Sequence, residues 1–448
     1  MKNVLIVGGG IAGITAAYHL SKSGYKVQIL EVTDNLGGRL TALFDSKSGE
    51  MIDNGQHALM TAYHTFLELL KECNADNLLN IQKHLEVTYY DTNQKKTRLY
   101  TGHLPSKAGF VLGFLLLGGL SVKSKINIVK LMRLIEKNPQ SSYYSEISCI
   151  DFLKQTNQTD SAISRFWEPF VVATMNCTLE QASASILINI LRRAFIEDLE
   201  NSKLILPAVD LRYILQPVIE KLKSQNVEIF CSTKVSSLLF EGKKIIGAET
   251  SKGEKYFADY IISALQPYSL LKILPNSLLE QFSYLEKFTY SPIVSVFIWT
   301  NHELFNEDFV ATLCTDIQWI FNRNKIIKHG LTKTFKHTYS ITTSTAAKFS
   351  SMKQSEIIDC VANDIKKVFP HFEKENILHY RIITEKFATF IANPQTEKIR
   401  PDTVTSIPNF FLAGDWANTK LPATIEGASF SGKKAAEAVI GQSKKKLI

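Results

Sequence analysis

A glycine-rich turn near the N-terminus constrains the fold of this chain most strongly. Residues 4–7 are a short β-branched run, which predicts a buried parallel strand. Gly8, Gly10 and Gly13 follow as G-x-G-x-x-G. In this pattern the first glycine makes the tight turn, the second lets the backbone approach a pyrophosphate, and the third allows close helix–strand packing. The helical pattern of residues 14–23 completes the start of a dinucleotide-binding unit.

The next predicted strand supports the same interpretation. Residues 26–30 form this strand, and Glu31 follows directly after it. An acidic residue about twenty positions after the glycines suits the hydroxyls of an unphosphorylated ribose. The N-terminus of the intervening helix offers unpaired N–H donors and partial positive charge to phosphates. This context favours dinucleotide binding over a chance glycine turn.

A second glycine pair indicates which dinucleotide binds. Gly37, Gly38 and Arg39 follow the ribose acid after a short loop. This G-G-R resembles the FAD enzymes of the amine oxidase and phytoene desaturase superfamily. The resemblance implies FAD as cofactor, with Gly38 and Arg39 along its pyrophosphate. An ordinary glycine turn with a solvated arginine is the alternative interpretation.

Length and composition bound the class of protein. The 448 residues predict two domains, and 45% apolar with 21% charged residues predicts a globular chain. The net charge of +8 fits an anionic cofactor or an anionic membrane surface. The basic residues are scattered and no nucleic-acid-binding motif is present, which argues against nucleic acid as a binding partner. Six cysteines without C-x-x-C spacing predict free thiols in a reducing compartment and no metal site.

Hydropathy bears on the location of the protein. No stretch reaches the roughly twenty apolar residues of a spanning helix, so we expect a cytoplasmic protein. Residues 109–120 are apolar, and the amphipathic segment 126–137 follows, with lysines around both. This region predicts either a core helix or pocket wall, or a surface on the inner face of the membrane that admits a lipid substrate.

The order of patterns predicts the domain organisation. We expect an α/β fold in which a Rossmann-like FAD-binding domain is interleaved with an α+β substrate domain, as in amine oxidases and phytoene desaturases. Residues 1–75, 206–270 and 391–448 would build the FAD-binding domain. Residues 76–205 would form a helical substrate- or membrane-facing region, and residues 271–390 the mixed sheet of the substrate domain.

The C-terminal segment is the second strong signal. Gly414 and Asp415 end an apolar strand, and an alanine-rich helix follows. By resemblance to the superfamily, this Gly-Asp caps the second half of FAD, and Thr424 and Ile425 contact FAD where the helix points at the flavin. The resemblance also implies that Val235 lies near the adenine through its backbone. A turn or helix cap is the alternative for Asp415.

Over nearly its whole length the chain resembles one branch, the squalene-associated FAD-dependent desaturase family. The matching motifs are D-N-G-Q-H at 53–57, F-W-E-P at 166–169, P-x-x-D-L at 207–211, S-P-I-V at 291–294, Q-W at 318–319, E-K-x-A-T at 385–389 and the segment 414–428. The resemblance implies reduction of hydroxysqualene, a C30 isoprenoid lipid, to squalene by reduced FAD in hopanoid biosynthesis. It also implies partner enzymes of squalene synthesis.

The implied reaction needs a proton donor. A protonated allylic hydroxyl leaves as water, and the delocalised cation accepts hydride in a dry, aromatic-lined tunnel. His57, Glu168 and Asp210 are candidate donors, because each lies in a motif outside the pyrophosphate grip. A carboxyl buried in an apolar pocket has a raised pKa and can donate a proton. A core histidine bonded to backbone is the alternative for His57, and a helix salt-bridge partner is the alternative for Glu168.

Three other functions stay open at this stage. A carotenoid-type desaturase would take hydride from a polyene C–H bond, and FAD motifs do not reveal the direction of transfer. An amine oxidase would release peroxide with amines, although the apolar segment 109–120 argues against it. A flavin-holding lipid carrier would bind FAD that no isoprenoid oxidises or reduces.

Overall fold

The computed structural model describes residues 2–104, 106–138, 142–332 and 334–445. Its first sheet has five strands, all parallel, in the order β10-β2-β1-β14-β20. The strands are β1 (Asn3–Val7), β2 (Lys26–Leu30), β10 (Glu228–Phe230), β14 (Tyr260–Ser263) and β20 (Phe410–Leu412). Three stretches far apart in the sequence therefore build one sheet. This agrees with the predicted interleaving, whereas the segment boundaries stay a prediction.

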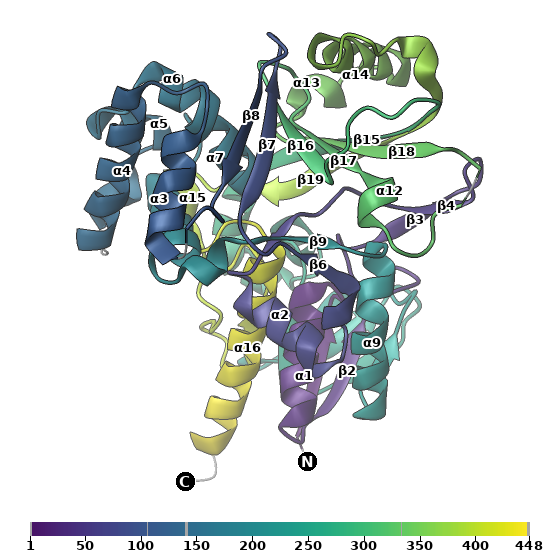
Figure 1. The fold of residues 1–448 in the computed structure, drawn as a ribbon. Coiled ribbons are helices and arrows are strands. Elements are labelled where there is room, and N and C mark those ends of the chain that lie inside the picture. Colours follow the sequence, from purple (N-terminus) through teal and green to yellow (C-terminus); the bar gives the residue numbers. More distant parts are fainter. Residues whose placement is uncertain (1, 105, 139–141, 333, 446–448) are drawn as a thin grey trace.

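Helices cover this sheet in the lower half of the molecule, where both termini lie (Figure 1). They are α1 (Ile11–Lys22), α2 (His64–Glu72), α9 (Leu211–Ser224) and α16 (Ile425–Lys445). The strands are apolar because helices bury them. Their side chains pack with those of the helices and form one core of the domain. An antiparallel sheet of β11 (Val235–Glu241), β12 (Lys244–Thr250) and β13 (Lys255–Phe257) lies between β10 and β14 in the chain.

The upper half contains a seven-stranded mixed sheet in the order β19-β15-β18-β17-β16-β7-β8. The strands are β7 (Glu86–Asp91), β8 (Lys96–Tyr100), β15 (Tyr290–Thr300), β16 (Phe309–Leu313), β17 (Trp319–Asn322), β18 (His337–Thr343) and β19 (Ile377–Phe390). Helices α13 (Ala347–Ser350) and α14 (Gln354–Val368) cover one face of this sheet. Val294 and Val296 of β15 point to that face and belong to the same hydrophobic core as residues of both helices. Because side chains alternate along a strand, Ser295 and Phe297 face the other side.

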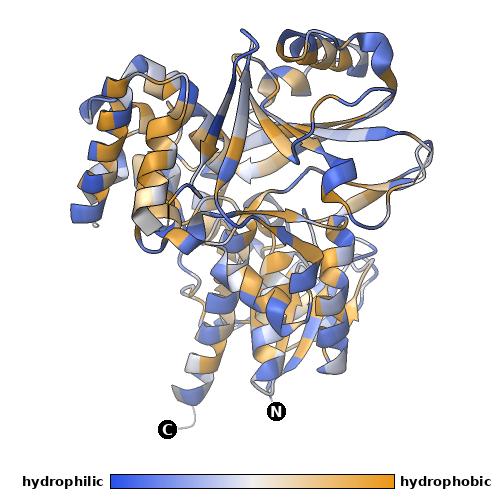
Figure 2. Cartoon of the chain, viewed as in Figure 1, coloured by the Kyte–Doolittle hydropathy of each residue, from blue (hydrophilic) through white to orange (hydrophobic). Residues whose placement is uncertain are grey.

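A helical lobe stands beside the mixed sheet (Figure 1). It comprises α3 (Ser106–Leu116), α4 (Val122–Lys137), α5 (Cys149–Gln155), α6 (Asp160–Ala162), α7 (Glu168–Met175) and α8 (Ala184–Leu191). Ser148 caps α5, since its side chain accepts a hydrogen bond from the Asp151 N–H. Figure 2 shows that α3 is largely hydrophobic along its length. Among the described residues, no helix is long and apolar enough to cross a bilayer.

Short elements connect these layers. They are β3 (Ala42–Asp45), β4 (Glu50–Asp53), β5 (Leu59–Met60), β6 (Leu79–Ile81), β9 (Leu204–Pro207), α10 (Pro267–Leu271), α11 (Asn276–Leu279), α12 (Arg323–Ile326) and α15 (Pro394–Ile399). Strands β3 and β4 form a hairpin, and β9 pairs with both β5 and β6. All six cysteines are free thiols.

Two features differ from the sequence-based expectation. The region 76–205, predicted to be helical, contributes β7 and β8 to the mixed sheet. Strand β7 also pairs in parallel with β16, across a long separation in the chain that no local pattern encodes. The long strand β19 was not predicted, because much of its sequence is polar or charged and only its end is fully buried.

Candidate active site

One cavity of about 990 Å³ connects the glycine turn after β1 with the helical lobe. Its volume lies at the upper end of the roughly 300–1,000 Å³ that ligand pockets span. Residues 54–60, which follow β4, run along the cavity between its two ends. The cavity is therefore bounded by the parallel sheet, the mixed sheet and the lobe.

The glycine turn forms one end of the cavity. Gly8 and Gly10 line it, and Gly10 caps α1 without a side-chain hydrogen bond. A Cβ at Gly10 would meet nothing within 4 Å, so the unpaired N–H groups at this helix start adjoin open space. Such a helix start binds phosphate. Gly13 lies outside the lining, and a Cβ there would overlap the carbonyl oxygen of Gly8, so Gly13 lets α1 pack closely against β1.

Glu31 lies at the same end, 7% exposed, at the carboxyl end of β2. Its Oε2 accepts a hydrogen bond from the Gly9 N–H at 2.7 Å, and its Oε1 accepts from the Thr33 N–H and hydroxyl at 2.9 Å each. A carboxylate has about four acceptor sites, so capacity remains for a ligand hydroxyl. Glu31 therefore both orders the glycine turn and faces the cavity.

Arg39 and Asp415 form an ion pair across the cavity wall. Arg39 Nη2 lies 2.7 Å from Asp415 Oδ2, and its Nη1 donates to the Ala388 carbonyl. Gly38, in left-handed conformation with φ of 61°, approaches Gly10 so closely that a Cβ would lie 3.1 Å from the Gly10 Cα. These residues bring the two predicted glycine segments and the C-terminal Gly-Asp segment together.

The start of α16 faces the same space. Gly414, Asp415, Thr424 and Ile425 all line the cavity. Thr424 Oγ1 accepts a hydrogen bond from the Gly427 N–H at 3.1 Å. Asp415 is 3% exposed, and among the described residues its Oδ1 has no hydrogen-bond partner. A buried carboxylate oxygen without a partner is a ready acceptor for a ligand hydroxyl.

These groups fit FAD. One cavity is lined by a helix start suited to phosphate, an acid suited to ribose hydroxyls, an arginine and a buried acceptor oxygen, the kinds of group that a dinucleotide requires. Val235 is the exception: it begins β11 and is not among the residues that line the cavity. The neighbouring Thr233 N–H donates to the Glu31 carbonyl at 2.8 Å, so this strand begins near the ribose acid. The adenine contact of Val235 stays a prediction.

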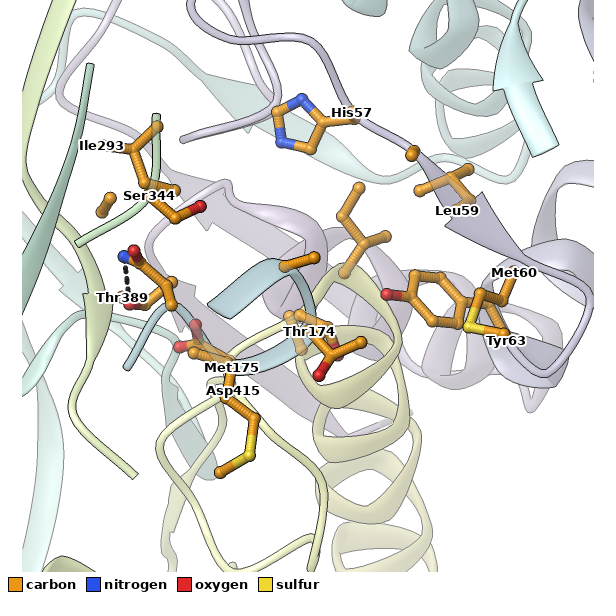
Figure 3. Close-up of a pocket in the computed structure, with 18 of the residues that line it drawn as sticks. His57, Leu59, Met60, Tyr63, Thr174, Met175, Ile293, Ser344, Thr389 and Asp415 are labelled. Carbon is orange, nitrogen blue, oxygen red and sulfur yellow. Dashed lines mark hydrogen bonds between the residues drawn. The ribbon is translucent and has the colours of Figure 1, made fainter. Parts of the chain in front are cut away.

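Of the three candidate proton donors, only His57 lines the cavity (Figure 3). Its Nδ1 lies 2.8 Å from the Gly55 carbonyl oxygen. A carbonyl can only accept, so Nδ1 carries the proton and Nε2 is left as an acceptor. Burial lowers the pKa of His57, which Arg39 lowers further, so the ring is neutral at neutral pH. This state suits accepting a hydrogen bond better than donating a proton.

The two candidate carboxyls lie elsewhere. Asp210 is the N-cap of α9 and accepts a hydrogen bond from the Tyr213 N–H at 3.1 Å. Glu168 is exposed at the start of α7, where partial desolvation by neighbouring groups and then the charge of Glu180 raise its pKa. Neither side chain is among those lining the cavity, so neither is placed to protonate a molecule bound there. Their motifs indicate helix starts, and helix starts favour acidic residues for local reasons.

The other end of the cavity is aromatic. Phe110 and Phe114 of α3 line it with Phe166, Phe170 and Phe195. Phe114 and Phe166 pack edge to face with ring centroids 4.8 Å apart, and Phe110 lies 5.4 Å from Phe195. Strands of the mixed sheet add Tyr89, Phe309, Trp319 and Phe321. This end is suited to a hydrocarbon chain or a delocalised cation.

Asn176 also lines the cavity, although the sequence gives no sign of it. It follows α7 in left-handed conformation with φ of 49°, and its amide N donates to Thr389 Oγ1 at 2.9 Å and to the Ser291 carbonyl at 3.1 Å. Its amide O accepts from the Thr345 N–H at 2.6 Å. Figure 3 marks the contact with Thr389, which lies near Ser344. Asn176 thereby joins the lobe to the mixed sheet at the cavity, and no local sequence pattern indicates this long-range role.

The sequence of this chain matches known proteins over nearly its full length. It is 24% identical to hydroxysqualene dehydroxylase of Zymomonas mobilis, covering 98% of this chain and 99% of that protein. It is 22% identical to 15-cis-phytoene desaturase of Synechococcus elongatus, covering 98% of this chain and 96% of that protein.

Solved structures show the same fold. An oxidoreductase from Methanosarcina mazei aligns with a TM-score of 0.75 at 19% identity, covering 97% of this chain and all of that one. Cyclohexylamine oxidase from Brevibacterium oxydans aligns with a TM-score of 0.70 at 14% identity, covering 99% of each chain.

A family also matches the sequence directly. The model of the family described as flavin containing amine oxidoreductase matches residues 11–440. The chain therefore belongs to the flavin containing amine oxidoreductases and is an FAD-dependent oxidoreductase.

Proposed function

We propose that this protein reduces hydroxysqualene to squalene as an FAD-dependent hydroxysqualene dehydroxylase. The observation that carries the proposal is the continuity of one cavity from a dinucleotide end to an aromatic end. A C30 isoprenoid needs a long apolar site beside the cofactor, and this cavity supplies one. The relatives named hydroxysqualene dehydroxylase, at 24% identity over the full length, support the same choice.

The residues of the cavity suit the chemistry. FAD supplies hydride when it is bound and reduced. Neutral His57 presents an acceptor nitrogen that can orient the hydroxyl of the substrate. The aromatic rings exclude water and stabilise positive charge that develops on the allylic carbons.

A carotenoid-type desaturase is the second candidate, because the apolar cavity end suits a polyene equally well. The phytoene desaturase of Synechococcus elongatus supports it at 22% identity. The two functions differ in the direction of hydride transfer.

The test is an anaerobic reaction of the reduced holoenzyme with hydroxysqualene in detergent. We expect the oxidised flavin spectrum to return and squalene to appear in the extract. A flavin that stays reduced would contradict the proposal. The oxidised holoenzyme is then mixed with phytoene, and flavin reduction with formation of a longer polyene would establish the desaturase.

We also propose that α3 and α4 rest on an anionic bilayer from which the lipid substrate enters. Val111, Leu115 and Leu116 of α3 and Val122 and Ile126 of α4 are apolar side chains at least 40% exposed. Val111 also lines the cavity, so the apolar patch adjoins the aromatic end. Lys123, Lys130 and Lys137 are exposed on α4, where lipid phosphates can meet them.

A further inference from the structure

A row of polar side chains lies on the cavity-facing side of the mixed sheet. Ser295 of β15 stands opposite Thr342 of β18, and Ser340 stands opposite Phe297. Because residues two apart on a strand face the same side, all four share one face. Thr342 lines the cavity. The row therefore begins at the cavity wall and leads away from it under the sheet face.

Arg323 and Asp53 form the inner end of the row. The Arg323 guanidinium carbon lies 5.4 Å from the ring centroid of Phe297, and its Nη2 donates to the Met51 carbonyl at 2.9 Å. Asp53 is fully buried, and its Oδ1 accepts from the Leu211 N–H at 2.8 Å. Arg323 Nη1 and Asp53 Oδ2 are 4.0 Å apart, too far for a direct hydrogen bond.

Buried polar atoms along this line have no hydrogen-bond partner among the residues that the structure describes. They are Asp53 Oδ2, Arg323 Nε and Nη1, the hydroxyls of Ser340, Ser295 and Thr342, and both amide atoms of Gln56. Ordered water is the usual partner of such atoms. Residues two apart on a strand, such as Ser340 and Thr342, are separated by roughly 7 Å, so ordered water between their hydroxyls would link them.

The loop before His57 packs directly on this row. A Cβ at Gly55 would lie 2.9 Å from Ser295 Oγ. Gln56, only 7% exposed, lines the cavity beside it. The row of hydroxyls and the carbonyl that holds His57 are thus neighbours at the point where the substrate hydroxyl would lie.

Glu50 connects the inner end to the surface. It is 1% exposed, and its Oε1 accepts from the partly exposed Thr332, through N–H at 3.3 Å and hydroxyl at 3.4 Å. Burial raises the pKa of Glu50, and burial raises the pKa of Asp53 to about 7. Asp210 adds to the rise for Asp53, whereas Arg323 opposes it for both carboxyls. Asp53 can therefore hold a proton near neutral pH, and burial shifts the pKa of Glu50 in the same direction.

We propose that Asp53 supplies protons to the cavity through ordered water held by Ser340 and Thr342. The proposal rests on the proposed function, because dehydroxylation consumes a proton for each hydroxyl that leaves. The proton passes from the Asp53 carboxyl along the water to the leaving oxygen, the C–O bond breaks, and water departs. The carbon then takes hydride from reduced flavin, and the Asp53 carboxylate regains a proton from solvent past Glu50.

The test compares single turnovers of reduced holoenzyme with hydroxysqualene in wild type, Asp53→Asn and Thr342→Val. We expect Asp53→Asn to slow flavin oxidation by ~100-fold, the lower end of what a general acid contributes, and Thr342→Val by roughly 10-fold. The wild-type rate should fall as pH rises through about 7, because Asp53 then loses its proton. The Asp53→Asn rate should lack this dependence.

Two controls separate proton supply from packing. Thr343 is buried on the opposite face of β18, so Thr343→Val makes the same change away from the row. Asp364 is a buried carboxylate of α14 that accepts from the Asp316 N–H at 2.7 Å, on the far side of the sheet. Asp364→Asn and Thr343→Val should keep the wild-type rate and pH profile. Equal rates for Thr342→Val and Thr343→Val would overturn the proposal, even where Asp53→Asn fails to fold.

A measurement without substrate separates this proposal from the proposed function. Photoreduction of the bound flavin takes up protons, which an indicator dye follows in weakly buffered solution. We expect slower proton uptake in Thr342→Val than in Thr343→Val, and equal uptake would overturn the proton route. If hydroxysqualene does not oxidise the reduced wild-type enzyme, the proposed function fails, and proton uptake alone then decides on the route.

Discussion

At the scale of single residues, Glu31 is held by three hydrogen bonds and still faces the cavity. We expect Glu31→Gln to weaken FAD binding by ~10-fold or more, since a hydrogen bond to a charged group contributes about 1.5–3 kcal/mol. Titration of the apoprotein with FAD, followed by flavin fluorescence, measures the change. Glu72→Gln, which removes the partner of Lys22 on the surface, should leave the FAD affinity unchanged.

His57 predicts a dependence of stability on pH. Burial lowers its pKa in the folded state, so the unfolded chain takes up a proton first as pH falls below about 6.5. The neutral ring therefore contributes stability at higher pH that is lost on acidification. Denaturant unfolding from about pH 7 to pH 5 should show a larger loss for wild type than for His57→Phe. An equal loss in both proteins would contradict the buried neutral ring, and His371→Phe, an exposed site, serves as control.

At the scale of elements, the packing of α1 on β1 depends on Gly13. A side chain there would overlap the Gly8 carbonyl oxygen, so Gly13→Ala should destabilise the protein by about 1–3 kcal/mol and impair FAD loading. Gly441, in α16, has nothing within 4 Å of its added Cβ. Gly441→Ala should instead stabilise the protein by about 0.5–1 kcal/mol. Thermal unfolding and flavin content of both variants test this contrast.

The exposed apolar residues of α3 predict binding to anionic vesicles. Leu115 and Leu116 are 46% and 57% exposed. We expect Leu115→Asp with Leu116→Asp to lower binding to anionic vesicles by more than ~10-fold, because each leucine contributes about 1.5–3 kcal/mol when buried. Leu378 of β19, 48% exposed, is the matched control away from the patch. Vesicle sedimentation measures the binding. If substitution of Leu378 by Asp weakened binding as much as the double substitution, α3 would be excluded as the contact surface.

At the scale of the whole molecule, the predicted FAD site joins segments from both ends of the chain. Arg39 pairs with Asp415 across the cavity, and Glu426 of α16 accepts a hydrogen bond from the Phe66 N–H at the start of α2. FAD binds the assembled site and not the unfolded chain. At a free FAD concentration 100 times its Kd, we expect the holoprotein to be about 2.7 kcal/mol more stable than the apoprotein. Calorimetry with and without FAD measures this, and equal melting temperatures would contradict it.

Residues close in sequence carried much of what could be predicted. The strand, glycine turn, helix and ribose acid of the first 31 residues form a unit whose geometry follows from neighbouring side chains. The C-terminal strand with its helix is equally local. Spacing therefore indicated a dinucleotide site, and the resemblance carried by Gly37, Gly38 and Arg39 indicated FAD.

Proximity between distant residues was decided only by the tertiary structure. His57, Glu168 and Asp210 carry equivalent sequence signals, yet packing places only His57 in the cavity. Asn176, Thr342 and the Asp53–Arg323 pair gain their positions from contacts across the chain, which no local period encodes. The sequence by itself determined the βαβ unit and its fit to a dinucleotide, because those depend on adjacent residues. The tertiary structure decided which polar groups face the substrate, because burial and distance depend on how the two sheets and the lobe meet.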